Sequence, residues 1–134
     1  MHAAFSVLMS TATDLRTLAA NVMRDGDTDL AAFFGHLAHD CRFVWANETP
    51  AQGPEEIQAL VGRMLAGVSG LRHDIIKQLV GEDSVALRMD VTYTLPDGGE
   101  FRTPAVTYMR FRDERIVEYL IYQDPTPLAR AAGR

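Results

Sequence analysis

Arg88 and Asp90 form the ionisable pair in this chain whose types and spacing best suit acid/base chemistry. They stand two residues apart within 84–94, where the odd-numbered residues are apolar and the even-numbered ones include a guanidinium and a carboxylate. This alternation predicts a β-strand with Arg88, Asp90 and Thr92 on one face. One interpretation is a strand with a solvated face. The other is a pocket in which Asp90 gives or takes a proton and Arg88 orients it.

A few other side chains could contribute to a site. His73 opens the preceding strand and could point into the same cavity, although a histidine at a strand start is often a surface residue. His36 and His39 lie three residues apart on a predicted helix, but no third ligand accompanies them, so we expect no metal site. Asp124 either caps the turn before Pro125 or closes the pocket mouth as a second carboxylate.

The composition is that of an ordinary globular protein. The chain has 134 residues, 47% hydrophobic and 23% charged, which indicates a single domain, 1–134. A net charge of −5 argues against a nucleic-acid partner. No apolar run suits a bilayer, so we expect a cytoplasmic protein without a membrane partner. The single cysteine, Cys41, rules out an internal disulfide and is more plausibly a small buried residue than a nucleophile.

The first half of the chain has helical periodicity. A first helix capped by Thr11 or Thr13 should run to about Arg24, where Asp25-Gly26-Asp27 is predicted to break it. Asp27 or Thr28 should cap a second helix, and Pro54 should open a third that ends near residue 67. The residues predicted to face inward are Leu15, Leu18, Ala19, Val22 and Met23, then Leu30, Phe33, Phe34 and Leu37, then Ile57, Leu60, Val61, Met64 and Leu65.

The second half of the chain has strand periodicity. A short strand is expected over 41–46, followed by strands at about 72–80, 84–95, 100–112 and 115–123. The turn formers Pro96-Asp97-Gly98-Gly99 predict a hairpin between two long strands. Three N-terminal helices followed by such strands predict an α+β fold with helices packed on a curved antiparallel or mixed sheet.

The order of these elements resembles the cone-shaped fold of the nuclear transport factor 2-like superfamily, and within it the SnoaL-like proteins. The resemblance covers roughly 12–128 and rests on Asp25-Gly26-Asp27, on Gly53-Pro54-Glu55-Glu56-Ile57, on Arg115-Ile116-Val117-Glu118-Tyr119 and on Asp124-Pro125. It implies a pocket in the concave sheet face, and a homodimer. The superfamily includes isomerases, epoxide hydrolases, cyclases, dehydratases and non-catalytic modules, so the resemblance does not select one activity.

Arg88-Met89-Asp90 is also similar to the Arg-x-Asp pair of limonene-1,2-epoxide hydrolase. In that family the aspartate is a general acid and the arginine bridges it to a second aspartate that activates water. By spacing, the second aspartate falls at Ile121, and the residues that hold the water fall at Phe43 and Trp45. This departure favours a non-hydrolytic reaction or mere binding over epoxide opening.

Three hypotheses therefore remain. The chain is an acid/base isomerase, cyclase, dehydratase or altered epoxide hydrolase, with Asp90, Arg88 and His73 as catalytic residues; or it binds a ligand without turnover; or it is a dimeric interaction module. We expect a small apolar, oxygen-bearing ligand and no cofactor. The predicted pocket-lining residues are Met23, Phe43, Trp45, Met64, Val68, Thr92, Thr107 and Ile121. Strands after residue 100 are apolar on both faces, which predicts a homodimer through the face that the helices leave uncovered.

Overall fold

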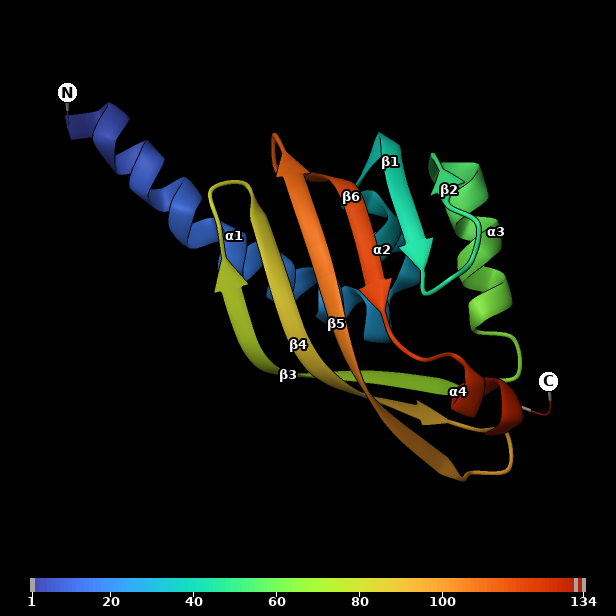
Figure 1. Ribbon diagram of the computed structural model, residues 1–134. Helices are drawn as coiled ribbons and strands as arrows, with labels where there is room; N and C mark the ends of the chain where they lie inside the picture. Colours follow the sequence, from blue (N-terminus) through green and yellow to red (C-terminus); the bar gives the residue numbers. More distant parts are fainter. Residues whose placement is uncertain (1, 132, 134) are drawn as a thin grey trace.

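The computed structural model describes the backbone of residues 2–131 and 133, and side chains from Leu15 onward. Over these residues the chain folds into four helices and six strands (Figure 1). The elements in chain order are α1 (His2–Thr28), α2 (Leu30–Gly35), β1 (Leu37–Trp45), β2 (Ala51–Gln52), α3 (Pro54–Met64), β3 (Gly70–Val80), β4 (Ser84–Thr94), β5 (Glu100–Arg112), β6 (Arg115–Tyr122) and α4 (Thr126–Ala131). No helix of the described part is long and apolar enough to span a membrane.

The strands form one six-stranded sheet in the order β2-β1-β6-β5-β4-β3. β1 and β6 run parallel, and every other neighbouring pair is antiparallel. Figure 1 shows β3, β4 and β5 bending strongly, with α1 and α2 on one side of the sheet and α3 beside β1 and β2. The α+β prediction with helices on a curved mixed sheet is confirmed.

The predicted helix boundaries need correction at two places. α1 begins at His2, so Thr11 and Thr13 lie inside it, and it continues through Asp25-Gly26-Asp27 to Thr28. One glycine costs a helix only about 1 kcal/mol, which tertiary packing can offset. α2 starts after Asp29, whose carboxylate accepts a hydrogen bond from the Ala32 N–H at 3.2 Å. It ends at Gly35, and Leu37 already belongs to β1.

The core lies between the helices and the inner face of the sheet. Along β4 and β5 the odd-numbered residues point inward, because side chains alternate between the faces of a strand and these two strands pair odd with odd. β3 follows the same parity up to Ile75, and a register shift after it places Gln78 beside Leu87 and Leu79 beside Ala86. A similar shift places Ile116 of β6 beside Phe111. The fully buried residues Leu87, Met89 and Met109 belong to this inner set. α1 covers it with four buried residues at helical spacing: Leu15, Ala19, Val22 and Met23.

The turn between β5 and β6 has an unusual backbone. Asp113 and Glu114 have φ values of 50° and 65°, in the left-handed region that suits glycine. Turns with this geometry match the twist of a hairpin and normally carry Asn-Gly or Asp-Gly. Here a glutamate occupies the second position, and its side chain is exposed.

Glu114→Gly should therefore stabilise the fold. Removing Cβ relieves a left-handed conformation that costs about 1–2 kcal/mol, while the extra backbone freedom of glycine returns ~0.5–1 kcal/mol to the unfolded chain. The free energy of unfolding should rise by about 0.5–1 kcal/mol, and the urea midpoint should rise with it. Glu82→Gly is the matched control, because Glu82 is also an exposed turn glutamate but has no positive φ. It should lower the midpoint; an equal effect of both substitutions would refute the strain argument.

Candidate functional site

An inner cavity lies between the inner face of the sheet and the helices. It has two lobes, of about 40 Å³ and about 50 Å³, which share wall residues such as His73, Met64 and Ile121. The sheet lobe is lined by Trp45, Met64, Leu65, Leu71, His73, Met89, Val91, Tyr93, Ala105, Thr107, Tyr119, Ile121, Gln123 and Leu128. The helix lobe is lined by Met23, Gly26, Leu30, Phe33, Phe43, Val61, Met64, Leu65, Leu71, His73, Tyr119 and Ile121.

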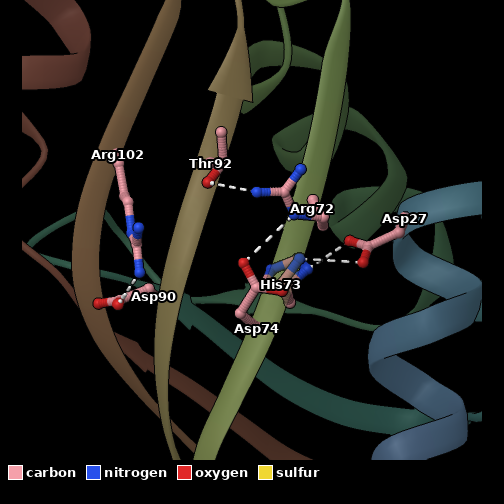
Figure 2. Close-up of polar contacts among 7 residues, drawn as sticks. All are labelled: Asp27, Arg72, His73, Asp74, Asp90, Thr92 and Arg102. Carbon is pink, nitrogen blue, oxygen red and sulfur yellow. Dashed lines mark hydrogen bonds and ion pairs between the residues drawn. The ribbon is translucent and has the colours of Figure 1, made fainter.

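His73 and Asp27 form the best-defined polar pair at this cavity. Asp27 lies in the last turn of α1 and His73 on β3, and Figure 2 shows the two side chains meeting. Oδ2 of Asp27 accepts the backbone N–H of His73 at 2.9 Å, and Oδ1 lies 2.5 Å from the ring Nδ1. An ionised carboxylate can only accept, so Nδ1 donates and the neutral ring presents Nε2 as its basic nitrogen. Both side chains are 15% exposed.

A second pair of the same kind lies nearby but outside the cavity. Asp25 Oδ2 is 2.7 Å from Nε2 of His36, which follows α2. Carboxylates in the last turn of a helix oppose its dipole, so Asp25 and Asp27 carry an electrostatic cost that their histidine partners offset. His36 therefore ties α1 to α2, while His73 ties α1 to the sheet.

Tyr93 and Gln123 supply neutral hydrogen-bonding groups to the sheet lobe. The Tyr93 hydroxyl lies 3.0 Å from Nε2 and 3.2 Å from Oε1 of Gln123. Burial raises the pKa of Tyr93, and the bond with Gln123 partly opposes that shift. Because His73 pairs with Val91 across β3 and β4, Tyr93 is a diagonal neighbour of His73 on the same face. The cavity thus combines a base with a neutral hydroxyl.

Most of the predicted lining residues are at or beside this cavity. Six of the eight line it: Met23, Phe43, Trp45, Met64, Thr107 and Ile121. His73, predicted as a catalytic residue, lines it as well. Val68 lines the adjoining α1 cleft, a hollow of about 360 Å³ that also includes Asp27 and Ser69. Their contribution to ligand binding stays a prediction.

The predicted orientation of Arg88, Asp90 and Thr92 is wrong. Asp90 points to the outer sheet face, where its Oδ2 accepts from Arg102 at 2.6 Å (Figure 2). Thr92 lies near Arg72 at 3.5 Å on that face, and Arg88 is exposed. The reason is the alternation itself: the apolar odd-numbered residues of β4 pack under the helices, which directs the even-numbered ones away from them. The catalytic role assigned to Asp90 and Arg88 therefore loses its geometric basis.

The remaining candidates have local roles. His39 is exposed, and the Asp124 carboxylate accepts from the Thr126 N–H at 3.0 Å, which caps the start of α4. Among the residues whose side chains are described, no group of three or more His, Cys, Asp and Glu could hold a metal ion.

Sequence reasoning missed Asp27, Tyr93 and Gln123 as site residues. The sequence carried a signal for Asp27 and another for Tyr93, but none for Gln123. An aspartate in the last turn of a helix is electrostatically unfavourable, so a hydrogen-bond donor or a basic side chain is expected beside it. Tyr93 lies on the apolar face of its strand and carries a polar hydroxyl, which needs a hydrogen bond when buried.

Comparison with known proteins identifies the family. The family model for the SnoaL-like domain matches residues 11–119. The chain belongs to the SnoaL-like domain family. No curated protein sequence matches this SnoaL-like chain.

Solved structures share the fold of this SnoaL-like protein at low sequence identity. AclR from Streptomyces galilaeus, described as a candidate hydroxylase, is 21% identical, with 91% of this chain and 97% of that chain covered and a TM-score of 0.76. A candidate SnoaL-like polyketide cyclase from Jannaschia sp. CCS1 is 16% identical, with coverages of 90% and 92% and a TM-score of 0.77. A protein with a ketosteroid isomerase-like fold from Catenulispora acidiphila, solved with trimethylamine, is 20% identical, with coverages of 87% and 92% and a TM-score of 0.74.

Cys41 should be unreactive in the folded SnoaL-like protein. It is fully buried, as expected, and burial raises the pKa of its thiol to about 12 from 9.0. Only the thiolate attacks a disulfide, and a shift of this size lowers the thiolate fraction near pH 8 by about a thousandfold. We expect Ellman's reagent to label native protein at least ~100-fold more slowly than protein unfolded in urea, with the native rate rising with pH. Prompt stoichiometric labelling of the folded chain would contradict this assignment.

Proposed function

We propose that this protein catalyses acid/base chemistry on a small, uncharged, apolar carbonyl compound, as an isomerase, cyclase or dehydratase does. The observation that carries the proposal is His73, which lines both lobes of the cavity and is held by Asp27 through two hydrogen bonds. A base fixed in this way needs little reorganisation at the moment of proton transfer. The site therefore rests on a His73–Asp27 dyad instead of Asp90.

In the simplest reaction, Nε2 of His73 removes a proton from the carbon next to the ligand carbonyl. The electron pair of that C–H bond moves onto the carbonyl oxygen, and the hydroxyl of Tyr93 donates a hydrogen bond to the oxygen that becomes negative. Return of the proton to a different carbon completes an isomerisation. In a cyclisation the enolate carbon attacks a second carbonyl carbon, the π pair of that carbonyl moves onto its oxygen, and protonated His73 returns the proton to the resulting alkoxide. Asp27 balances the positive charge that His73 carries between the two steps.

The charges around the cavity favour an uncharged ligand. None of the side chains that line the two lobes is a lysine or an arginine, so a carboxylate or phosphate would enter without a counter-ion. The acidic residues Asp27 and Asp29 in the α1 cleft would add repulsion. A structural neighbour described as a candidate SnoaL-like polyketide cyclase supports an oxygenated apolar ligand.

Substitution of His73 tests this proposal. Wild-type protein should accelerate the isomerisation of 3-cyclohexen-1-one to 2-cyclohexen-1-one, followed by ultraviolet absorbance. His73→Gln should lower the rate by ~10²–10⁴-fold, the range typical for a lost acid/base group. His36→Gln is the matched control, because it breaks the other histidine–aspartate pair away from the cavity. Equal rates for wild type and His73→Gln would reject the dyad as a catalyst and leave ligand binding without turnover.

We also propose that two copies of the chain associate through the outer sheet face. One row of apolar residues crosses five strands in register: Leu79, Ala86, Tyr108, Leu120 and Val44. In the next row Val106 pairs with Tyr122, and these two are 40% and 61% exposed. An uninterrupted apolar band of this kind on a sheet is costly in water.

The charges beside the band suit a self-complementary contact. Asp90 pairs with Arg102 on one side and Arg110 with Glu118 on the other, the latter at 3.6 Å. Each pair contains one acidic and one basic side chain, so the same surface of a second copy, related by a two-fold axis, can meet it without net repulsion.

Val106→Glu should dissociate this dimer by placing a charge within the apolar band. Sedimentation equilibrium should give about twice the 14.8 kDa chain mass for wild type and the single-chain mass for the variant. Ala59→Glu, on an exposed position of α3, is the control and should leave the dimer intact. A monomeric wild type at micromolar concentration would rule out the interface.

A further inference from the structure

Leu128 separates the inner cavity from an open hollow beside it. It is the buried side chain of α4, 3% exposed, and it lines the sheet lobe. It also lines the α4 cleft, a hollow of about 240 Å³ formed with Trp45, Asn47, Glu48, Met64, Pro125 and Ala129. Because Trp45 and Met64 line both spaces as well, these three side chains form the wall between them.

The inner cavity is too small for a ring compound while this wall is closed. Its lobes have about 40 Å³ and about 50 Å³, whereas a cavity of ~150 Å³ is needed to admit benzene. Pockets for metabolite-sized ligands usually have ~300–1,000 Å³. A wall must therefore move before such a ligand can reach His73.

The α4 side is the wall that can move at the lowest cost. Towards the α1 cleft the wall includes Leu71, which is held in β3 by its pairing with Tyr93. α4 has one buried side chain, and its described backbone bonds are local, such as Ala129 N–H to Pro125 O at 3.0 Å. It follows β6 through Asp124 and Pro125 (Figure 1). Short helices with few buried contacts open with little free energy.

We propose that Leu128 is the size-determining residue of the site. In the closed form its side chain occupies the position of part of the ligand. In the open form an uncharged compound of one or two fused rings takes its place between Trp45 and Met64, with its reactive end towards His73 and its remainder in the α4 cleft. The inference rests on the proposed function for the assignment of the inner cavity as the ligand site. It concerns which ligands can enter that cavity, and not the reaction that follows.

Trp45 gives a direct measurement of this step, because it is the single tryptophan of the sequence and contacts both spaces. Titration of its fluorescence with cyclohexanone and with 2-tetralone compares a one-ring with a two-ring uncharged ketone. Leu128→Ala should bind 2-tetralone about tenfold or more tightly than wild type, since an open form populated at ~0.1–10% penalises wild-type affinity by that fraction. The gain for cyclohexanone should be smaller. Arg130→Ala, at an exposed position of the same helix, should behave as wild type.

Two results would overturn the proposal. Leu128→Ala could bind both ketones as wild type does, or bind 2-tetralone more weakly because the side chain is only a passive wall. Should that variant fail to fold, hydrogen exchange of wild-type protein decides: amides of 128–131 should exchange orders of magnitude faster than those of β5, and equal protection would refute a movable α4. Turnover and binding measured on His73→Gln separate the two proposals. Turnover tests His73 as the base, and ketone binding tests size selection, so either proposal can fail while the other stands.

Discussion

The carboxylate of Asp27 is the contact on which the arrangement of the site depends. It accepts both the backbone N–H and the ring Nδ1 of His73, so one side chain joins the last turn of α1 to β3. The contact is unfavourable to the helix alone, because a negative charge opposes the dipole at that end. It is favourable to the assembled fold, since it sets the position of β3 against α1 and directs the imidazole towards the cavity. Packing of the apolar stripe of α1 holds the same two elements together, so core and site reinforce each other.

The second organising constraint is the alternation of side chains along the strands. Because β4 and β5 pair odd with odd along their whole length, one face of the sheet collects the core and the cavity, and the other collects the apolar band with its ion pairs. β4 illustrates the division: Met89 and Val91 line the cavity, while Asp90 between them meets Arg102 outside. A shift of one residue in this strand would exchange the two surfaces.

Much of the fold was predictable from the sequence because its patterns are strong. The hairpin at Pro96–Gly99 and the period-two runs give β4 and β5 to within about a residue, and Pro54 marks the start of α3. The site was less predictable. The alternation around Asp90 is clear in the sequence, but similarity to an Arg-x-Asp motif favours a pocket position for this carboxylate, whereas it is the apolar face of the strand that meets the helices. The partnership of Asp27 with His73 joins residues far apart in the chain, and no local pattern reports such a distance.

A histidine backed by a carboxylate suits this cavity better than the carboxylate first predicted. A neutral imidazole enters apolar surroundings at a much lower desolvation cost than an ion does. The charge that enables it to act as a base lies behind it on Asp27, which adjoins the more open α1 cleft and has two N–H partners. When His73 takes a proton, the imidazolium and Asp27 become a close ion pair, so no isolated charge is left in the apolar space. In the proposed reaction the surroundings of the ligand therefore stay apolar, while the ionic part of the chemistry is confined to the junction between α1 and β3.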